Sequence, residues 1–156
     1  MKIPKFYEIN LFLCFHLPKT EIMEIGIKHL HHFLPFIFYI VLLVVIVKAY
    51  LGKFTNPKKD KLLTVTLILA HTQLLLGLYL MIDFISKAGI HMGESANRFI
   101  TIEHPLTMII GVILLTAGKL KAKKIEDVAK ANKTIYAYFL VALVLFALRT
   151  PWDKLI

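Results

Sequence analysis

Four long apolar stretches dominate the chain, and the polar residues gather in short segments between them. The stretches cover about residues 31–51, 62–85, 100–120 and 134–150. The first three reach the length of about 20 residues that a helix needs to cross a bilayer core. The fourth is shorter and spans the core if Lys133 and Arg149 extend to the interfaces. Apolar residues cover most of the circumference, without the period-two alternation of barrel strands. The pattern predicts four transmembrane helices.

The connections between the stretches are short and polar. They cover residues 52–60, 86–97 and 121–133. Connections of this length force neighbouring helices to run antiparallel. We therefore predict an all-α fold, an integral membrane four-helix up-down bundle formed by residues 23–156.

Composition supports this prediction, and charge adds an orientation. The chain has 156 residues, of which 58% are hydrophobic, and a soluble domain of that size could not bury so much apolar surface. Eleven of the 19 Lys and Arg residues surround the first and third connections together with three acidic residues, which gives net +8 of the total +9. The positive-inside rule places these two connections in the cytoplasm and both termini outside, as in a multi-pass protein of the bacterial inner (cytoplasmic) membrane.

The lysines therefore encode topology and an attraction to anionic lipid headgroups. Nucleic-acid binding is not expected, because no aromatic residues are interleaved with the basic ones as they would be in a stacking platform. The sequence also lacks the motifs of kinases, zinc proteases and serine hydrolases, and we expect no independent catalytic activity.

Residues 1–22 follow a different pattern from the rest of the chain. Their apolar core, residues 9–17, is too short to span a membrane, and no small-residue cleavage site follows it. Met23 then opens a segment that leads directly into the first stretch. We predict that residues 1–22 are an N-terminal extension and that Met23 is the true start.

Ionisable groups inside a membrane are costly, so each is a functional hypothesis. His71 lies near the middle of the second stretch and needs a partner, which we expect from another helix or from a cofactor; a hydrogen bond to a facing Thr, Tyr or backbone carbonyl is the simpler alternative. His104 precedes Pro105, so the backbone there should be irregular. His29 and His31 lie near the outer start of the first helix.

Haem needs axial ligands on opposite faces of its plane. The sequence allows His31 with His104, or His71 with one of them, and does not choose between these pairs. Arg98 and Arg149, at outer helix ends, could pair with haem propionates or with lipid phosphates.

Several other polar and small residues serve packing or pairing in this interpretation. Gly111 and Gly118 could admit a neighbouring helix or a flat macrocycle. Gln73 faces away from His71, and we assign it to packing. Asp83 is spaced to pair with a lysine four residues later.

Four strings carry a resemblance to a known family. They are His29-Leu30-His31-His32-Phe33-Leu34, Ala70-His71-Thr72-Gln73-Leu74-Leu75-Leu76-Gly77, Glu103-His104 with Met108, and Arg149-Thr150-Pro151-Trp152. Over residues 27–153 the chain resembles the small bacterial four-helix inner-membrane proteins labelled cytochrome b-like. The resemblance implies haem b held by histidines, with His31, His71 and His104 matching the pattern, and a place near respiratory electron transfer. Pro35-Phe36 departs from that pattern, which has a basic residue and a tryptophan there.

The leading hypothesis is a haem-binding electron-transfer or respiratory-chain-associated membrane protein. Its expected partners are the lipid bilayer, and respiratory membrane subunits or quinone. The alternative is a cofactor-free accessory or assembly subunit of a membrane complex. A third hypothesis is a transition-metal carrier that uses His29, His31 and His32 as its entry site.

Overall fold

The chain folds into long helices, in a computed structural model that describes residues 19–152. The elements are α2 (Lys19–Tyr50), α3 (Lys61–Ala88), α4 (Ser95–Arg98), the π-helical turn η1 (Phe99–Glu103), α5 (His104–Lys124) and α6 (Val128–Arg149). Because α4, η1 and α5 follow one another without a break, the described residues contain four helices long and apolar enough to cross a membrane. The prediction of an all-helical chain with four helices able to cross a membrane is confirmed for these residues.

Helix boundaries differ from the predicted ones mainly where the sequence is charged. Helix α2 begins at Lys19, so residues 19–22 of the predicted extension continue into the first span, while residues 1–18 lie outside the described part of the chain. Helix α6 begins at Val128, which reduces the third connection to residues 125–127. Hydropathy marks only the apolar part of a helix, whereas Lys, Glu and Ala extend it with good helix propensity.

Two aspartates inside the lysine-rich connections begin the helices that follow them. Asp60 Oδ1 accepts hydrogen bonds from the backbone N–H groups of Leu62 and Leu63, at 2.8 and 3.3 Å. Asp127 Oδ1 does the same for Ala129 and Lys130, at 2.9 and 3.3 Å. An aspartate at this position satisfies N–H groups that have no partner within the helix. The few acidic residues in these connections therefore set where α3 and α6 start.

Glycines bring α5 and α6 together. A Cβ atom at Gly111 would lie 2.2 Å from Cε1 of Phe146, and one at Gly118 would lie 2.6 Å from Cβ of Tyr138. The space above both glycines is thus filled by α6 side chains. Of the two roles expected for these glycines, close helix packing is confirmed, and the expectation that they leave room for a macrocycle is wrong.

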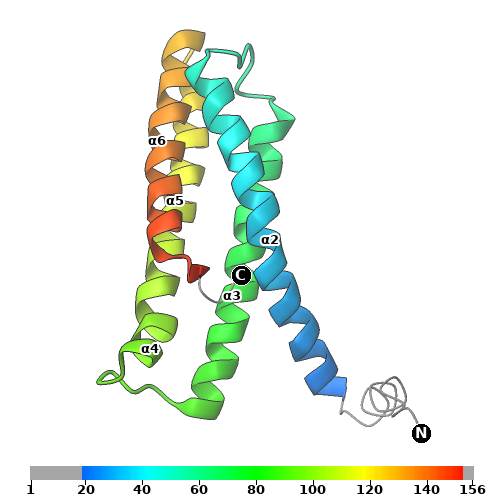
Figure 1. The fold of residues 1–156 in the computed structure, drawn as a ribbon. Coiled ribbons are helices and arrows are strands. Elements are labelled where there is room, and N and C mark those ends of the chain that lie inside the picture. The colour runs from blue at the N-terminus through cyan, green and yellow to red at the C-terminus, as the bar shows by residue number, and fades with distance from the viewer. Residues whose placement is uncertain (1–18, 153–156) are drawn as a thin grey trace, which may run out of the picture.

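Each long helix packs on two neighbours: α2 lies against α3 and α6, and α5 also lies against α3 and α6. The 51–60 connection and the α5–α6 turn lie at one end of the molecule, and the 89–94 connection lies at the other, where α2 leans away from α5 and α6 (Figure 1). Fully buried side chains include Leu42, Val45, Leu63, Leu115, Ile135 and Phe139.

A buried amide ties the first connection to α6. Asn132 Nδ2 donates to the carbonyl of Phe54 at 2.9 Å, and its Oδ1 accepts from the N–H of Phe54 at 3.2 Å. The Phe54 side chain is fully buried. This amide therefore closes the core at this end of the bundle, and the cavity described next lies towards the opposite end.

Candidate functional site

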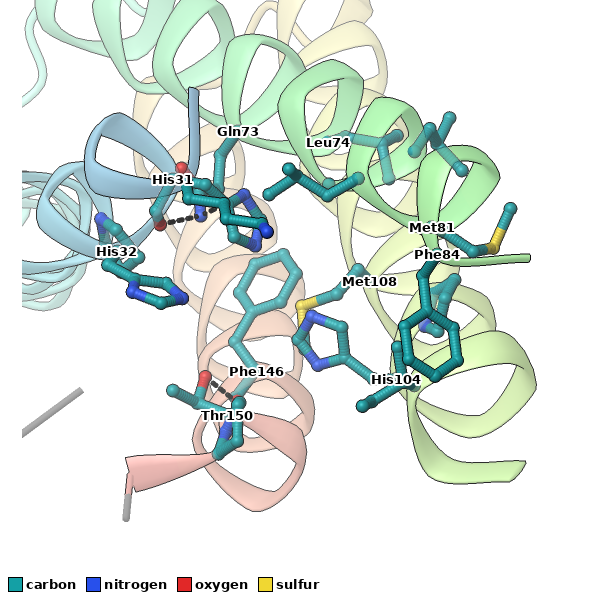
Figure 2. A pocket seen from close by; sticks show the side chains of 18 of the residues that line it. His31, His32, Gln73, Leu74, Met81, Phe84, His104, Met108, Phe146 and Thr150 are labelled. Atoms are coloured by element: carbon teal, nitrogen blue, oxygen red, sulfur yellow. Dashed lines mark hydrogen bonds between the residues drawn. The ribbon is translucent and has the colours of Figure 1, made fainter. Parts of the chain in front are cut away.

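A cavity of about 390 Å³ lies among α2, α3, α5 and α6, towards the end of the molecule away from the lysine-rich connections. Small-molecule sites in proteins span roughly 300–1,000 Å³ and are mostly apolar with a few polar groups. The wall has that composition. Its apolar part includes Pro35, Phe38, Leu74, Met81, Phe84, Met108 and Phe146, and its uncharged polar part includes His31, His32, Gln73 and His104. Figure 2 shows how the side chains that it labels lie around the space.

His31 enters the cavity from α2 and is held by α3. Gln73 Nε2 donates to the backbone carbonyl of His31 at 2.8 Å and lies 3.0 Å from its Nδ1. The ring also lies against Gly77, where a Cβ would be 2.9 Å from its Cε1. Because Gly77 has no side chain and Gln73 reaches across from one turn earlier, a single face of α3 fixes both the backbone and the ring of His31.

His104 enters from the opposite side, at the first residue of α5 (Figure 2). Its Nδ1 lies 2.7 Å from the carbonyl oxygen of Arg149 in α6. A carbonyl oxygen can only accept, so Nδ1 carries the proton and donates it. In the neutral ring this leaves Nε2 with a free lone pair.

The backbone before His104 is a π-turn, and proline explains it. A proline ring clashes with the carbonyl four residues earlier in a regular α-helix, which here would be that of Thr101. In the wider turn, the N–H of His104 donates to the carbonyl of Phe99, five residues earlier. The expected irregular backbone at His104 is confirmed. Such turns within helices occur frequently at functional sites.

The two outer arginines share one carboxylate. Arg98 Nε donates to Glu103 Oε1 at 2.9 Å, and Arg149 Nη1 donates to Glu103 Oε2 at 3.0 Å. Neither arginine lines the cavity. Glu103 therefore holds both guanidinium groups that we considered for propionates or lipid phosphates. It also anchors the residue whose carbonyl orients His104.

Charged residues line the cavity near the ends of α2 and α3. Glu24 binds Lys28 at 2.5 Å and also Lys87, and Lys87 binds Asp83 at 2.9 Å. The predicted pairing of Asp83 with the lysine four residues later is confirmed. Since Glu24 and Lys87 belong to different helices, this chain of ion pairs closes α2 onto α3 beside the cavity.

His71 lies outside this site. Its side chain is exposed on the outer surface of α3, and its Nδ1 lies 2.7 Å from the carbonyl oxygen of Leu67, one turn earlier in the same helix. The prediction that its partner comes from another helix is therefore wrong for Nδ1, because its own backbone supplies that partner. Binding of a cofactor through Nε2 stays a prediction. His29 is also exposed and does not line the cavity.

Sequence reasoning missed the two residues that organise His31. The sequence predicts a packing role for Gln73, but this residue makes both hydrogen bonds to His31. The family pattern marks Pro35 only as a departure, although it stands four residues after His31 and lines the cavity. A proline four residues after a histidine was the available signal, because it leaves that histidine's carbonyl without a helical partner.

The cavity offers ring nitrogens of His31 and His104 as donors. One or two such nitrogens suit a larger group, such as a macrocycle, better than a bare metal ion. Within residues 19–152, no three His, Cys, Asp or Glu side chains cluster as metal ligands would, which gives no support to a carrier site at His29, His31 and His32. His104 fits an axial haem ligand, because ligating histidines donate their second nitrogen to a carbonyl or carboxylate.

Comparison with known proteins identifies no relative: no family model, no curated protein and no solved structure matches this chain.

Proposed function

We propose that the chain is a multi-pass protein of the bacterial cytoplasmic membrane, an up-down bundle with both termini outside. The support is the asymmetric charge, because eleven of the 19 basic residues gather around two connections that lie at one end of the molecule (Figure 1). Positive charge near helix ends is retained in the cytoplasm. In this orientation the cavity lies in the outer half of the membrane.

Within that bundle, we propose that the cavity binds haem b and that the protein serves electron transfer in or beside the respiratory chain. One observation carries the proposal. His31 of α2 and His104 of α5 line the same largely apolar cavity, and the Nδ1 of His104 is hydrogen-bonded to a carbonyl, as in a metal-ligating histidine.

When bound, haem supplies a one-electron couple that the side chains lack. The chain's own residues would hold and tune it. His104 would present the Nε2 lone pair, with its ring orientation fixed by the Arg149 carbonyl. Apolar neighbours such as Phe84, Met108 and Phe146 would exclude water, and burial of this kind is one of the determinants of haem potential.

The test is a reduced-minus-oxidised absorption spectrum of the full chain, expressed with sufficient haem and purified in mild detergent. We expect the Soret band of haem b, shifted on reduction. His104→Ala should abolish it, whereas His71→Ala should leave it unchanged, because His71 lies on the outer surface of α3. A colourless wild-type preparation, or an equal response of the two variants, would contradict the proposal.

A cofactor-free accessory subunit is the second candidate, and one observation favours it. Each of the three histidines assigned to haem already has a partner within the chain, namely Gln73 for His31, the Leu67 carbonyl for His71 and the Arg149 carbonyl for His104. No cofactor is needed to satisfy these bonds. This candidate predicts a colourless protein whose His104→Ala variant loses stability but no absorbance.

A further inference from the structure

The backbone carbonyl of His31 lacks the N–H donor that a regular helix would provide. In an α-helix the carbonyl of His31 would accept the N–H of the residue four positions later, and that residue is Pro35, which has none. A buried carbonyl without a partner is costly. Gln73 Nε2 takes the vacant place at 2.8 Å, reaching it from α3.

This contact fixes which end of the Gln73 amide faces His31. The carbonyl requires a donor, so the group next to it is the NH₂ and not the oxygen. The same NH₂ lies 3.0 Å from Nδ1 of the ring and has a second hydrogen to donate there. Nδ1 of His31 is therefore an acceptor, and the proton of the neutral ring is on Nε2.

The other end of the amide shows what this orientation costs. Gln73 Oε1 is buried without a hydrogen-bond partner, and among the described residues it is the one buried side-chain N or O atom in that condition. An unpaired buried acceptor costs about 1–3 kcal/mol. The amide keeps this orientation because the opposite one would place its oxygen against both the carbonyl and Nδ1 of His31.

The two cavity histidines are thus chemically unlike. His104 donates through Nδ1 to a carbonyl and offers a lone pair at Nε2. His31 accepts at Nδ1 from Gln73 and offers an N–H at Nε2. Only a nitrogen lone pair can bind iron, so only His104 is ready to do so.

We propose that Pro35 and Gln73 hold His31 as a hydrogen-bond donor and not as a metal ligand. Haem in this cavity would then be bound by His104 alone, and the space beside His31 would take a small diatomic ligand that accepts a hydrogen bond. This inference rests on the proposed haem site. Pro35 and Gln73 act through His31 and are positioning residues.

The first test reads the histidine protons without any haem. The full chain, carrying ¹⁵N-labelled histidine in lipid nanodiscs, is measured by ¹⁵N NMR, with His31→Ala and His104→Ala to assign the rings. We expect the proton on Nε2 in His31 and on Nδ1 in His104. Gln73→Glu, which replaces the donor by an acceptor, should move the His31 proton to Nδ1. Pro35→Ala should weaken the preference, because the alanine backbone would supply the missing N–H. A proton on Nδ1 of wild-type His31 would overturn the inference.

The second test reads the coordination of bound haem. We expect a five-coordinate, high-spin ferrous spectrum that changes on adding carbon monoxide. His31→Ala should keep the haem and raise the C–O stretching frequency, because the N–H donor is lost, while His104→Ala should lose the haem. A low-spin wild-type spectrum that becomes high-spin in His31→Ala would overturn the inference and leave the proposed function standing. Failure to bind haem at all would instead contradict the proposed function.

Discussion

The ring of His31 rests on the backbone of Gly77, where an added Cβ would lie 2.9 Å from Cε1. Gly77→Ala should therefore move the ring away from the Gln73 amide. The ring is the end of a side chain that can rotate, and alanine gains about 1 kcal/mol of helix propensity over glycine. We expect little change in stability but a clear change in the NMR signals of the His31 ring.

Gly26→Ala is the matched control for this variant. Gly26 lies in α2 with no atom within 4 Å of its added Cβ, so it reports helix propensity alone. Its His31 signals should match those of the wild type. If Gly77→Ala leaves the ring signals equally unaltered, then α3 does not hold the ring through this contact.

The α5–α6 contact should tolerate substitution far less. Gly111→Ala would place a Cβ 2.2 Å from Cε1 of Phe146, a residue that is only 4% exposed and would have to shift towards the cavity that it lines. Overpacking of this kind costs about 1–3 kcal/mol. We expect a lower midpoint of thermal unfolding in mild detergent, with Gly26→Ala again as the control. An unchanged midpoint would mean that the two helices do not approach this closely.

The amide of Asn132 should matter for the closed end of the bundle. Asn132→Leu keeps similar bulk but leaves the buried N–H and carbonyl of Phe54 without partners, at about 1–3 kcal/mol for each unsatisfied group. Thermal unfolding should show a clear loss of stability. Asn56→Leu changes an exposed residue of the connection that contains Phe54, and it should have a much smaller effect. Equal effects would assign no special role to the buried amide.

The proposed orientation can be tested with single thiols. Cys14 is the chain's one cysteine, so Cys14→Ser gives a background without thiols. In it, Gly93→Cys should react with a membrane-impermeant maleimide in intact spheroplasts, and Asn56→Cys only after the membrane is disrupted. Both positions are exposed and lie in connections at opposite ends of the bundle. The reverse labelling pattern would invert the topology.

Hydropathy was sufficient to find the four long helices, because a segment that crosses lipid must be apolar along its length. Because these helices are apolar along their whole length, hydropathy does not indicate which side of each helix faces its neighbours. In a soluble helix the apolar stripe marks the core, but a lipid-facing surface is as apolar as the interior. Leu75, for example, is exposed on α3 although nothing in its type separates it from a core leucine.

The two polar residues of α3 illustrate the consequence. His71 and Gln73 are two positions apart, so at about 100° per residue they point to nearly opposite sides of the helix. Either could have been the inward one. The choice depends on contacts with α2, namely a carbonyl freed by Pro35 and a glycine at residue 77, and these become visible only when the two helices are placed side by side.

The π-turn at Phe99–Glu103 makes the site sensitive to chain length as well as to residue type. A turn of this kind holds one residue more than an α-turn. Removing a single residue from it, such as Ile102, would force an ordinary α-turn, in which the Pro105 ring clashes with a carbonyl, and would break the five-residue spacing that lets Arg98 reach Glu103. Deletion of Ile102 would therefore be more disruptive than most substitutions, even though every side chain lining the cavity would remain present.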